Sequence, residues 1–205
     1  MPRAGLTPAL VIAGAADLAD EVGFDRLTLA ALAARFGVAV PSLYKHVDGL
    51  EAVRRGVAIA ALGELGAALA AGQAAAAEAP PAERLRVLAH AYRAFATARP
   101  GRYAATVRAA QPDDAEHAAA AGSALHVVLA VLGELGLTGD AAVDAARGLR
   151  ALLHGFASLE AAGGFGMPRD VDESLDRIVD AYGRALTLST ERAHPGSDVA
   201  PPAPG

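Results

Sequence analysis

Apolar residues recur every three or four positions along most of the chain, which is the period of α-helices that bury one face. The first such segment begins after Thr7-Pro8, because threonine caps helix N-termini and proline fits the first helical position. Gly23 ends this segment. A short second helix is predicted between Thr28, which caps it, and Gly37, which stops it. The chain is therefore predicted to begin with two helices joined by a short connection.

Further segments with the same period follow, separated by glycine, proline and aspartate. A very short third helix is predicted from Pro41 to His46, and a long fourth helix begins after Asp48. The fourth helix is predicted to fray into the alanine-rich stretch 72–81, which is interpreted as a linker. The remaining helices are predicted at about 81–99, 101–108, 113–135, 140–163 and 172–188. Residues 189–205 are rich in proline and poor in apolar residues, which predicts a disordered tail.

Composition narrows this pattern to an all-α fold with about nine helices. Hydrophobic residues make up 53% of the 205 residues, enough for a sizeable core, whereas aromatic residues make up only 4%. Alanine, the best helix former, is abundant, and typical strand formers are scarce. The chain has no cysteine, which excludes disulfides, thiolate zinc sites and cysteine nucleophiles.

No membrane segment, export signal or enzyme motif is recognised in the sequence. The uncharged stretch between His117 and Glu134 is shorter than the ~20 residues that a spanning helix needs, and the N-terminus does not resemble a signal peptide. A cytoplasmic protein that does not contact membrane is expected. Nucleotide-binding loops and a serine-hydrolase elbow are absent from the sequence, so neither an enzyme nor a bound cofactor is expected. The histidines at 90, 117, 126 and 154 lack the pairwise spacing of a helical metal site, so no metal is expected.

Residues 28–47 have the pattern of a helix-turn-helix, in which the second helix enters the DNA major groove. Gly37 supplies the backbone conformation of a tight turn, and Ala33 is small where the two helices approach closely. A seam of Leu32, Phe36 and Leu43, together with Val38, would hold the helices together. The candidate groove-reading residues on the exposed face are Val40, Pro41, Ser42, Tyr44, Lys45 and His46.

Charge leaves an alternative open at this point. Residues 1–55 carry six basic and six acidic groups, whereas residues 56–205 carry twelve basic and seventeen acidic groups. The acidity therefore lies outside the candidate reader, which is the distribution that a DNA-binding head would prefer. Short helical hairpins also occur in proteins that never touch DNA, so an all-α binding or scaffold protein with a purely structural hairpin is the competing hypothesis.

The N-terminal segment resembles the TetR family of transcriptional repressors. The resemblance covers about residues 7–56 and is carried by Gly23-Phe24-Asp25, Leu27-Thr28, Leu32-Ala33, Phe36-Gly37-Val38 and Ser42-Leu43-Tyr44-Lys45-His46-Val47. It implies that Thr28 lies against a DNA phosphate and that Pro41, Ser42, Tyr44, Lys45 and His46 lie on the recognition helix. Tyr44 and His46 would touch the DNA backbone.

One departure from the family concerns the start of the next helix. Family members usually carry a lysine there for a phosphate, but this chain has Asp48-Gly49-Leu50. Arg3 in the N-terminal arm is a candidate replacement. The departure bears on the affinity for DNA rather than on whether DNA is bound.

The second region, about residues 80–188, resembles the ligand-binding domain named for a Trp-His-Gly (WHG) motif. The resemblance is carried by the segment 149–160, by Gly163-Gly164-Phe165 and by Pro168. His154-Gly155 supplies two letters of the motif, but the chain has no tryptophan. These resemblances divide the chain into a DNA-binding domain at 1–56, a regulatory and dimerisation domain at 57–188 and a tail at 189–205.

A ligand pocket is predicted among the large side chains of the second region. The candidates are Tyr92, Phe95, Tyr103 and Phe156, with His126, Arg147 and His154 as polar neighbours. Pockets between helices of a bundle are typical ligand sites. The alternative is that these aromatic residues simply form the core.

Together these features predict a ligand-responsive repressor. Two copies would bind a palindromic operator in double-stranded DNA, with half-sites about one turn, ~34 Å, apart or a multiple of that. A small-molecule effector, whose identity the sequence does not reveal, would release the DNA. The last two long helices are predicted to form the homodimer interface, helped by Ala146, Ala157, Ala161, Ala181 and Gly183, with Ile178 either in that interface or in the chain's own core.

Overall fold

The computed structural model of the chain describes residues 5–193, and side chains up to Leu188. Every regular element within this range is helical, which confirms the all-α prediction. The elements are α1 (Pro8–Val22), a 3-10 turn η1 (Phe24–Arg26), α2 (Leu29–Phe36), α3 (Val40–Leu43), α4 (Gly49–Ala75), α5 (Pro81–Ala98), α6 (Pro100–Thr106), α7 (Ala115–Glu134), α8 (Gly139–Ala161) and α9 (Val171–Ala193).

The first two helices begin and end where their capping residues predict. The Thr7 hydroxyl accepts a hydrogen bond from the Leu10 amide at 3.2 Å, and the Thr28 hydroxyl accepts one from the Ala31 amide at 3.1 Å. Gly37 ends α2 with a φ of 64°, in the left-handed region that favours glycine. The predicted boundaries of these two helices are therefore confirmed.

The prediction of a linker at 72–81 is wrong for residues 72–75, which are helical. Helix α4 continues to Ala75, and Gln73 is almost fully buried. The Gln73 amide donates to the Arg84 carbonyl at 2.9 Å, and the Arg84 guanidinium donates back to it at 3.0 Å. These reciprocal hydrogen bonds satisfy a buried polar side chain, so the alanine-rich end of α4 is held against α5.

The shortest and the last helices also differ from their predicted limits. Helix α3 spans Val40–Leu43, and the chain continues as a turn closed by the His46 amide on the Leu43 carbonyl at 2.9 Å. Helix α9 extends past the predicted end at Leu188 to Ala193, so the first residues of the predicted tail are helical. The rest of the tail lies outside the described residues.

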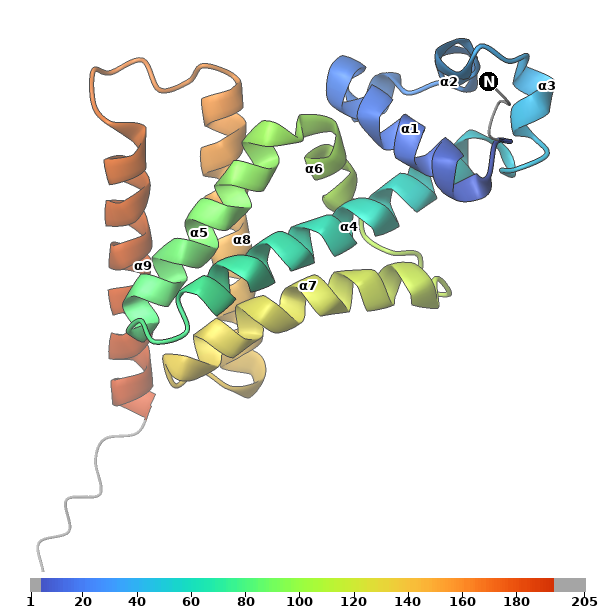
Figure 1. Ribbon diagram of the computed structural model, residues 1–205. Helices are drawn as coiled ribbons and strands as arrows, with labels where there is room; N and C mark the ends of the chain where they lie inside the picture. Colours follow the sequence, from blue (N-terminus) through green and yellow to red (C-terminus); the bar gives the residue numbers. More distant parts are fainter. Residues whose placement is uncertain (1–4, 194–205) are drawn as a thin grey trace, which may run out of the picture.

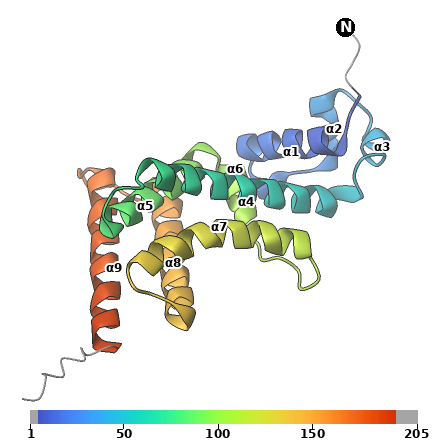
Figure 2. The ribbon, with the colours of Figure 1, turned by 60° about the horizontal axis from the view of Figure 1, so that its bottom comes forward.

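The helices form a small head and a larger second region joined by α4. Helices α1–α3 pack around the start of α4, which then runs away from the head (Figure 1). Helices α5 and α7 lie along α4, and α8 and α9 lie at the end far from the head (Figure 2). Helix α4 is therefore common to both regions.

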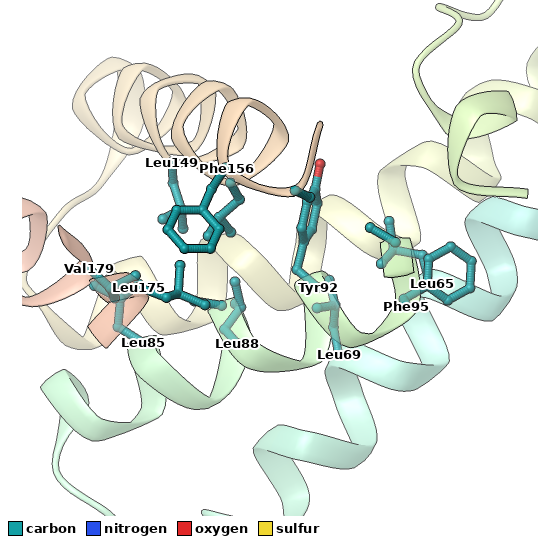
Figure 3. Close-up of a cluster of buried hydrophobic side chains, with 14 of the residues drawn as sticks. Leu65, Leu69, Leu85, Leu88, Tyr92, Phe95, Leu149, Phe156, Leu175 and Val179 are labelled. Carbon is teal, nitrogen blue, oxygen red and sulfur yellow. The ribbon is translucent and has the colours of Figure 1, made fainter. Parts of the chain in front are cut away.

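Two main clusters of buried side chains match this division. The head cluster contains Val11, Leu27, Leu32, Leu43 and Val53, and also Ala105 from α6. In the second cluster, Leu85 and Leu88 of α5 face Leu149 and Phe156 of α8 (Figure 3). Ala105 of α6 belongs to the head cluster, and Tyr103 of the same helix belongs to the second cluster. Helix α6 therefore packs against both regions.

Two helices are long and apolar enough to cross a membrane by length and composition alone, namely Gly49–Ala75 and Ala115–Glu134. This differs from the expectation that no stretch would reach that length. Both are packed together within the fold: α4 runs through the centre of the structure and α7 lies along it. A core helix of a globular protein passes the same test.

Candidate functional site

The hairpin of α2 and α3 has the geometry that the sequence predicts. Leu32 and Leu43 are fully buried, and Ala33 is 3% exposed at the closest approach of the two helices. The Val38 amide donates to the Ala33 carbonyl at 3.0 Å, which closes the turn around Gly37. This seam fixes one face of α3 against the core and leaves the opposite face outward.

The seven predicted DNA-contacting residues all reach the surface of the head. Pro41, Tyr44 and Lys45 are exposed, with Tyr44 at 58%, and Val40, Ser42 and His46 are half-buried. Thr28 is exposed at the start of α2, where its hydroxyl caps the helix. Large aromatic side chains are usually buried in a folded domain. An exposed tyrosine beside an exposed lysine is therefore the chemistry expected of a surface that binds a polar partner.

Ion pairs within the chain occupy most of the basic side chains of the head. Arg35 makes a bidentate contact with Glu21 at 2.8 and 2.9 Å, and Arg54 pairs with Glu51 at 2.8 Å. Within the part of the chain whose side chains are described, Lys45 has no carboxylate partner. Its ammonium group is available to a phosphate in a way that those arginines are not.

The segment that lacks the family's lysine begins α4. Asp48 precedes the helix without a side-chain capping bond, and Gly49 has a φ of 89° that only glycine adopts readily. No basic side chain precedes Arg54 in this helix. The candidate replacement, Arg3, lies outside the described residues.

The second region contains a cavity of about 450 Å³ between α4, α5, α7 and α8, which lies within the ~300–1,000 Å³ range of small-molecule sites. Its walls are mainly aliphatic: Leu62, Leu65, Leu69, Leu88, Leu125, Val128, Leu149 and Leu153, together with several alanines. Leu125 and Gly122 of α7 are exposed as well as lining, so the cavity opens beside α7.

The polar lining of this cavity comes from four side chains. They are Tyr92 of α5, Thr106 at the end of α6, Arg108 just after it, and Arg150 of α8. A guanidinium nitrogen of Arg150 donates to the Thr106 carbonyl at 3.1 Å. None of the described residues that line the cavity is acidic.

Of the seven residues predicted to line a pocket, Tyr92 is the one that lies in the lining of this cavity. Phe95 and Phe156 belong to the core, which was the alternative for the aromatic residues. His126 and Arg147 point to solvent on the outer faces of α7 and α8 and do not line the cavity. The helical period places residues on a face but does not tell which face meets a cavity.

Tyr103 and His154 are connected to the cavity through a chain of hydrogen bonds. The hydroxyls of Tyr92 and Tyr103 are 2.9 Å apart, and the Tyr103 hydroxyl lies 2.5 Å from Nδ1 of His154. Burial raises the pKa of both tyrosines above their usual value, so both remain neutral hydroxyls. The chain runs from the cavity wall through α6 to a shallow depression that Tyr103 and His154 line on its far side.

Helix α6 also holds the head. Gly101 lies so close to α1 that a Cβ placed there would be 2.0 Å from the Ala19 carbonyl. The next residue, Arg102, is almost fully buried and pairs with Asp17 at 2.7 Å, with Asp20 and with Glu64. Helix α6 therefore contacts α1 at its start and the cavity at its end.

A second contact between the regions is an ion pair. Arg55 of α4 binds Asp114, the N-cap of α7, through two bonds of 2.6 Å, and Glu116 at 2.8 Å. The guanidinium lowers the pKa of Asp114 to about 2, aided by the hydrogen bond that the His117 amide donates. Asp114 is therefore a charged cap throughout the neutral range.

The outer faces of α8 and α9 carry exposed apolar side chains. Leu159 is 54% exposed, Ile178 is 40% exposed and Leu188 is 55% exposed. Ala161 and Ala181 are also exposed, whereas Ala146 and Ala157 pack inside the chain's own core and Gly183 lies against Leu85. Ile178 thus faces away from its own core.

Among the side chains that the structure describes, no three histidine, aspartate or glutamate residues are grouped so that they could hold a metal ion. His90 is half-exposed and lies 2.7 Å from Asp176, and His117 packs beside Asp114. Asp176 therefore accounts for His90, whereas Nδ1 of His117 lies 4.0 Å from Asp114 and its buried Nε2 has no hydrogen-bond partner among the described residues.

Comparison with known proteins assigns each of the two regions to a protein family. Residues 11–49 match the family described as bacterial regulatory proteins, tetR family, and residues 85–182 match the tetracyclin repressor-like C-terminal domain. The HTH-type transcriptional regulator YobS of Bacillus subtilis (strain 168) is 34% identical over 191 residues, which is 93% of this chain and 97% of that protein. The HTH-type transcriptional regulator Rv0681 of Mycobacterium tuberculosis (strain H37Rv) is 40% identical over 157 residues, 75% of this chain and 69% of that protein.

Solved structures share the arrangement of the helices. A protein from Rhodococcus sp. RHA1 superposes with a TM-score of 0.76 at 27% identity, over 91% of this chain and 98% of that one. A TetR variant from Acinetobacter baumannii AYE in complex with minocycline superposes with a TM-score of 0.61, over 92% of this chain and 98% of that one. At 23% identity the second match shows the fold alone. The chain has an exposed helix-turn-helix, matches two domain families and is similar to a transcriptional regulator over 93% of its length. These findings together establish that this chain belongs to the TetR family of DNA-binding transcriptional regulators.

Proposed function

We propose that the chain is a cytoplasmic, ligand-responsive repressor that binds a palindromic operator as a homodimer and releases it when a small molecule occupies the cavity. The observation that carries the proposal is the position of α6. One end of this short helix is packed against α1 of the head through Gly101 and Arg102, and its other end supplies Thr106 to the cavity. A ligand that moves α6 would therefore also move the head.

The head supplies the DNA contacts in this proposal, with the domain limits 1–56 and 57–188. Lys45 and the Thr28 hydroxyl would bind phosphates, and Tyr44 and His46 the DNA backbone. Val40, Pro41 and Ser42, at the start of the recognition helix, would face base edges in the major groove. The exposure of Tyr44 and Lys45 supports this assignment.

The dimer in this proposal forms through α8 and α9. Helices α8 and α9 of the two copies would form a four-helix contact that buries the exposed apolar side chains of Leu159 and Ile178. The small residues Ala161 and Ala181 would allow the helices to approach closely. A two-fold contact of this kind repeats the same patch on both copies and matches a palindrome in the DNA. It also sets the spacing of the two heads, on which operator binding depends.

The test uses DNA fragments from around the gene in a gel-shift experiment with the whole chain. We expect one fragment to shift, and nuclease protection to show two symmetric half-sites whose centres are about one turn, or a multiple of it, apart. The Lys45→Ala variant should shift the same fragment more weakly. Protection of a single half-site by a monomer would contradict the dimeric repressor.

A further inference from the structure

The cavity is chemically uneven, and this unevenness indicates the class of molecule that it takes. Most of its wall is leucine, valine and alanine, with Leu65, Leu69 and Leu149 among the buried side chains. Its charged groups are the two guanidinium groups of Arg108 and Arg150, and no described lining residue is acidic. An apolar ligand that carries one negative charge matches both features.

Arg150 is unusual among the basic side chains of the second region. Arg84, Arg86 and Arg93 each bind a carboxylate of the chain at hydrogen-bond distance. Within the part of the chain whose side chains are described, Arg150 has no carboxylate partner, and its guanidinium donates instead to the neutral Thr106 carbonyl at 3.1 Å. An arginine without a counterion at an apolar cavity can gain a charge-assisted bidentate bond from an incoming carboxylate.

Arg108 adds a second positive charge to the same part of the lining. Its ion pair with Glu51 is long, at 3.8 Å, and both side chains are exposed, at 55% and 72%. Exposed pairs of this kind contribute little free energy, so Arg108 can exchange Glu51 for a ligand. Thr106 and the Tyr92 hydroxyl, which burial keeps neutral, offer further hydrogen bonds to the same group.

The cavity is also elongated. Its lining on α7 extends from Ala118 to Val128, which at 1.5 Å per residue is a span of about 15 Å. On α4 the lining extends from Leu62 to Leu69. An unbranched aliphatic chain fits such a channel and would replace apolar wall exposed to water by apolar contact.

We infer that the cavity binds an aliphatic carboxylate, with the carboxylate on Arg150 and Arg108 and the hydrocarbon chain along Leu65, Leu69 and Leu125. Binding moves the Arg150 guanidinium from the Thr106 carbonyl to the ligand. The end of α6 thereby loses a hydrogen bond when the ligand enters. This inference rests on the proposed function for its regulatory meaning, but the binding itself can be tested without DNA.

The experiment titrates the whole chain with decanoate, with 1-decanol and with acetate in a calorimeter, below the concentration at which micelles form. We expect decanoate to bind at least about tenfold more tightly than 1-decanol, because a hydrogen bond to a charged group exceeds one to a neutral group. Acetate, which lacks the chain, should not bind measurably. Equal affinity for decanoate and 1-decanol, or no binding of decanoate, would overturn the inference.

Variants locate the charge recognition. Arg150→Gln should weaken decanoate binding about tenfold and leave 1-decanol unchanged, whereas Arg150→Lys should retain most of the affinity. Arg147→Gln is the matched control, because Arg147 lies on the same helix, is 78% exposed and does not line the cavity. Equal decanoate affinities for Arg150→Gln and Arg147→Gln would reject Arg150 as the ligand's partner. If Arg150→Gln does not fold, the wild-type comparison of decanoate with its alcohol still decides.

Addition of decanoate to the gel shift separates this inference from the proposed function. Binding of decanoate with loss of the DNA complex supports both. Absence of any DNA complex without ligand contradicts the proposed repressor while the calorimetry still reports on the cavity. Decanoate that fails to bind, with an intact DNA complex, overturns the ligand class and leaves the repressor standing.

Discussion

The head and the second region of this protein differ in how close together in the sequence the residues of their candidate sites lie. In the head, a contiguous segment of twenty residues, 28–47, contains the cap, the turn glycine, the buried seam and the exposed face of the hairpin. In the second region, the cavity wall is assembled from residues of α4 to α8 that are far apart in the sequence. A motif can be recognised only where the interacting residues are close together in the chain.

The two regions also differ in how their charges are used. Most basic side chains of the head are neutralised by nearby acids, and Lys45 is left exposed on the recognition face. In the second region, ion pairs join α5 to α8 and α9. The cavity is lined by two arginines and by no acidic residue among those described. Lys45 in the head and Arg150 at the cavity, neither of which binds a carboxylate among the described side chains, therefore mark the candidate partner surface of each region: phosphate for the head and a carboxylate for the cavity.

The largest expected effect comes from Ile178→Asp, which tests whether the second region controls the head through dimerisation. Ile178 is 40% exposed in the single chain, so the folded monomer should tolerate the charge. Burying an unpaired charge in the dimer costs several kcal/mol. We expect monomers with normal circular dichroism and no operator binding, measured by light scattering and gel shift.

Ala119→Asp is the control for this prediction, because Ala119 is exposed near the start of α7 and belongs to neither of the two helices proposed to form the dimer. It should leave both the mass in solution and the operator affinity unchanged. A wild-type chain that remains monomeric at tens of micromolar would contradict the dimer and the two-half-site mechanism with it.

The next effect concerns the contact that joins the two regions. Gly101→Ala would place a Cβ 2.0 Å from the Ala19 carbonyl and 2.4 Å from the Asp20 amide, both backbone atoms that cannot rotate away. Overpacking of this kind costs about 1–3 kcal/mol, and it should push α1 away from α6. We expect a lower melting temperature and weaker operator binding.

Gly133→Ala is the matched control for Gly101→Ala. It also replaces a helical glycine, but nothing lies within 4 Å of the added Cβ. Because alanine is the better helix former by about 1 kcal/mol, this variant should be as stable as the wild type or slightly more so. Equal melting temperatures for the two variants would show that α1 and α6 are not tightly packed in solution.

The same contrast explains how far the sequence predicted the structure. The caps Thr7 and Thr28 and the turn at Gly37 act through bonds to residues three or four positions away, so their roles follow from local chemistry. The extension of α4 to Ala75 depends on Gln73 meeting Arg84 of the next helix, a tertiary contact that overrides the appearance of a linker.

The pocket residues show the limit of that reasoning. Aromatic side chains were expected to line the pocket, but Phe95 and Phe156 fill the core and the lining comes mainly from leucine and alanine. Arg150 was not among the expected polar residues, whereas Arg147, one helical turn earlier on α8 and outside the cavity lining, was. A signal that could have found Arg150 is its position between Leu149 and Leu153, two core residues on the same helix.

A smaller effect is expected for the recognition helix itself. Tyr44→Ala and Lys45→Ala remove exposed side chains and should leave the stability within about 0.5 kcal/mol of the wild type. Each should weaken operator binding, and Lys45→Ala should reduce the salt dependence by about one unit of slope, because one phosphate contact is lost. Measuring affinity at several salt concentrations checks this.

Arg147→Ala is the control for the loss of a positive charge, since Arg147 is 78% exposed and belongs to α8, a helix at the end of the structure far from the head (Figure 1). It should change neither the operator affinity nor the slope with salt. Unchanged binding for Tyr44→Ala and Lys45→Ala, with folding confirmed by circular dichroism, would contradict the assignment of α3 and its following turn as the reader.

The smallest effect concerns acid stability and the ion pair between the start of α4 and α7. Arg55 lowers the pKa of Asp114 from 3.8 to about 2 in the folded chain. A carboxyl group whose pKa is lowered by folding stabilises the fold above its unfolded pKa, and this contribution is lost as the pH falls through the folded pKa. The Arg55–Asp114 contribution should therefore be complete above about pH 4 and disappear toward pH 2. Arg55→Gln removes the main cause of the shift, so its melting temperature should approach that of the wild type as the pH falls across this window. Melting curves of both proteins between pH 5 and pH 2 measure the convergence, and a constant difference between them would show that the pair does not persist in solution.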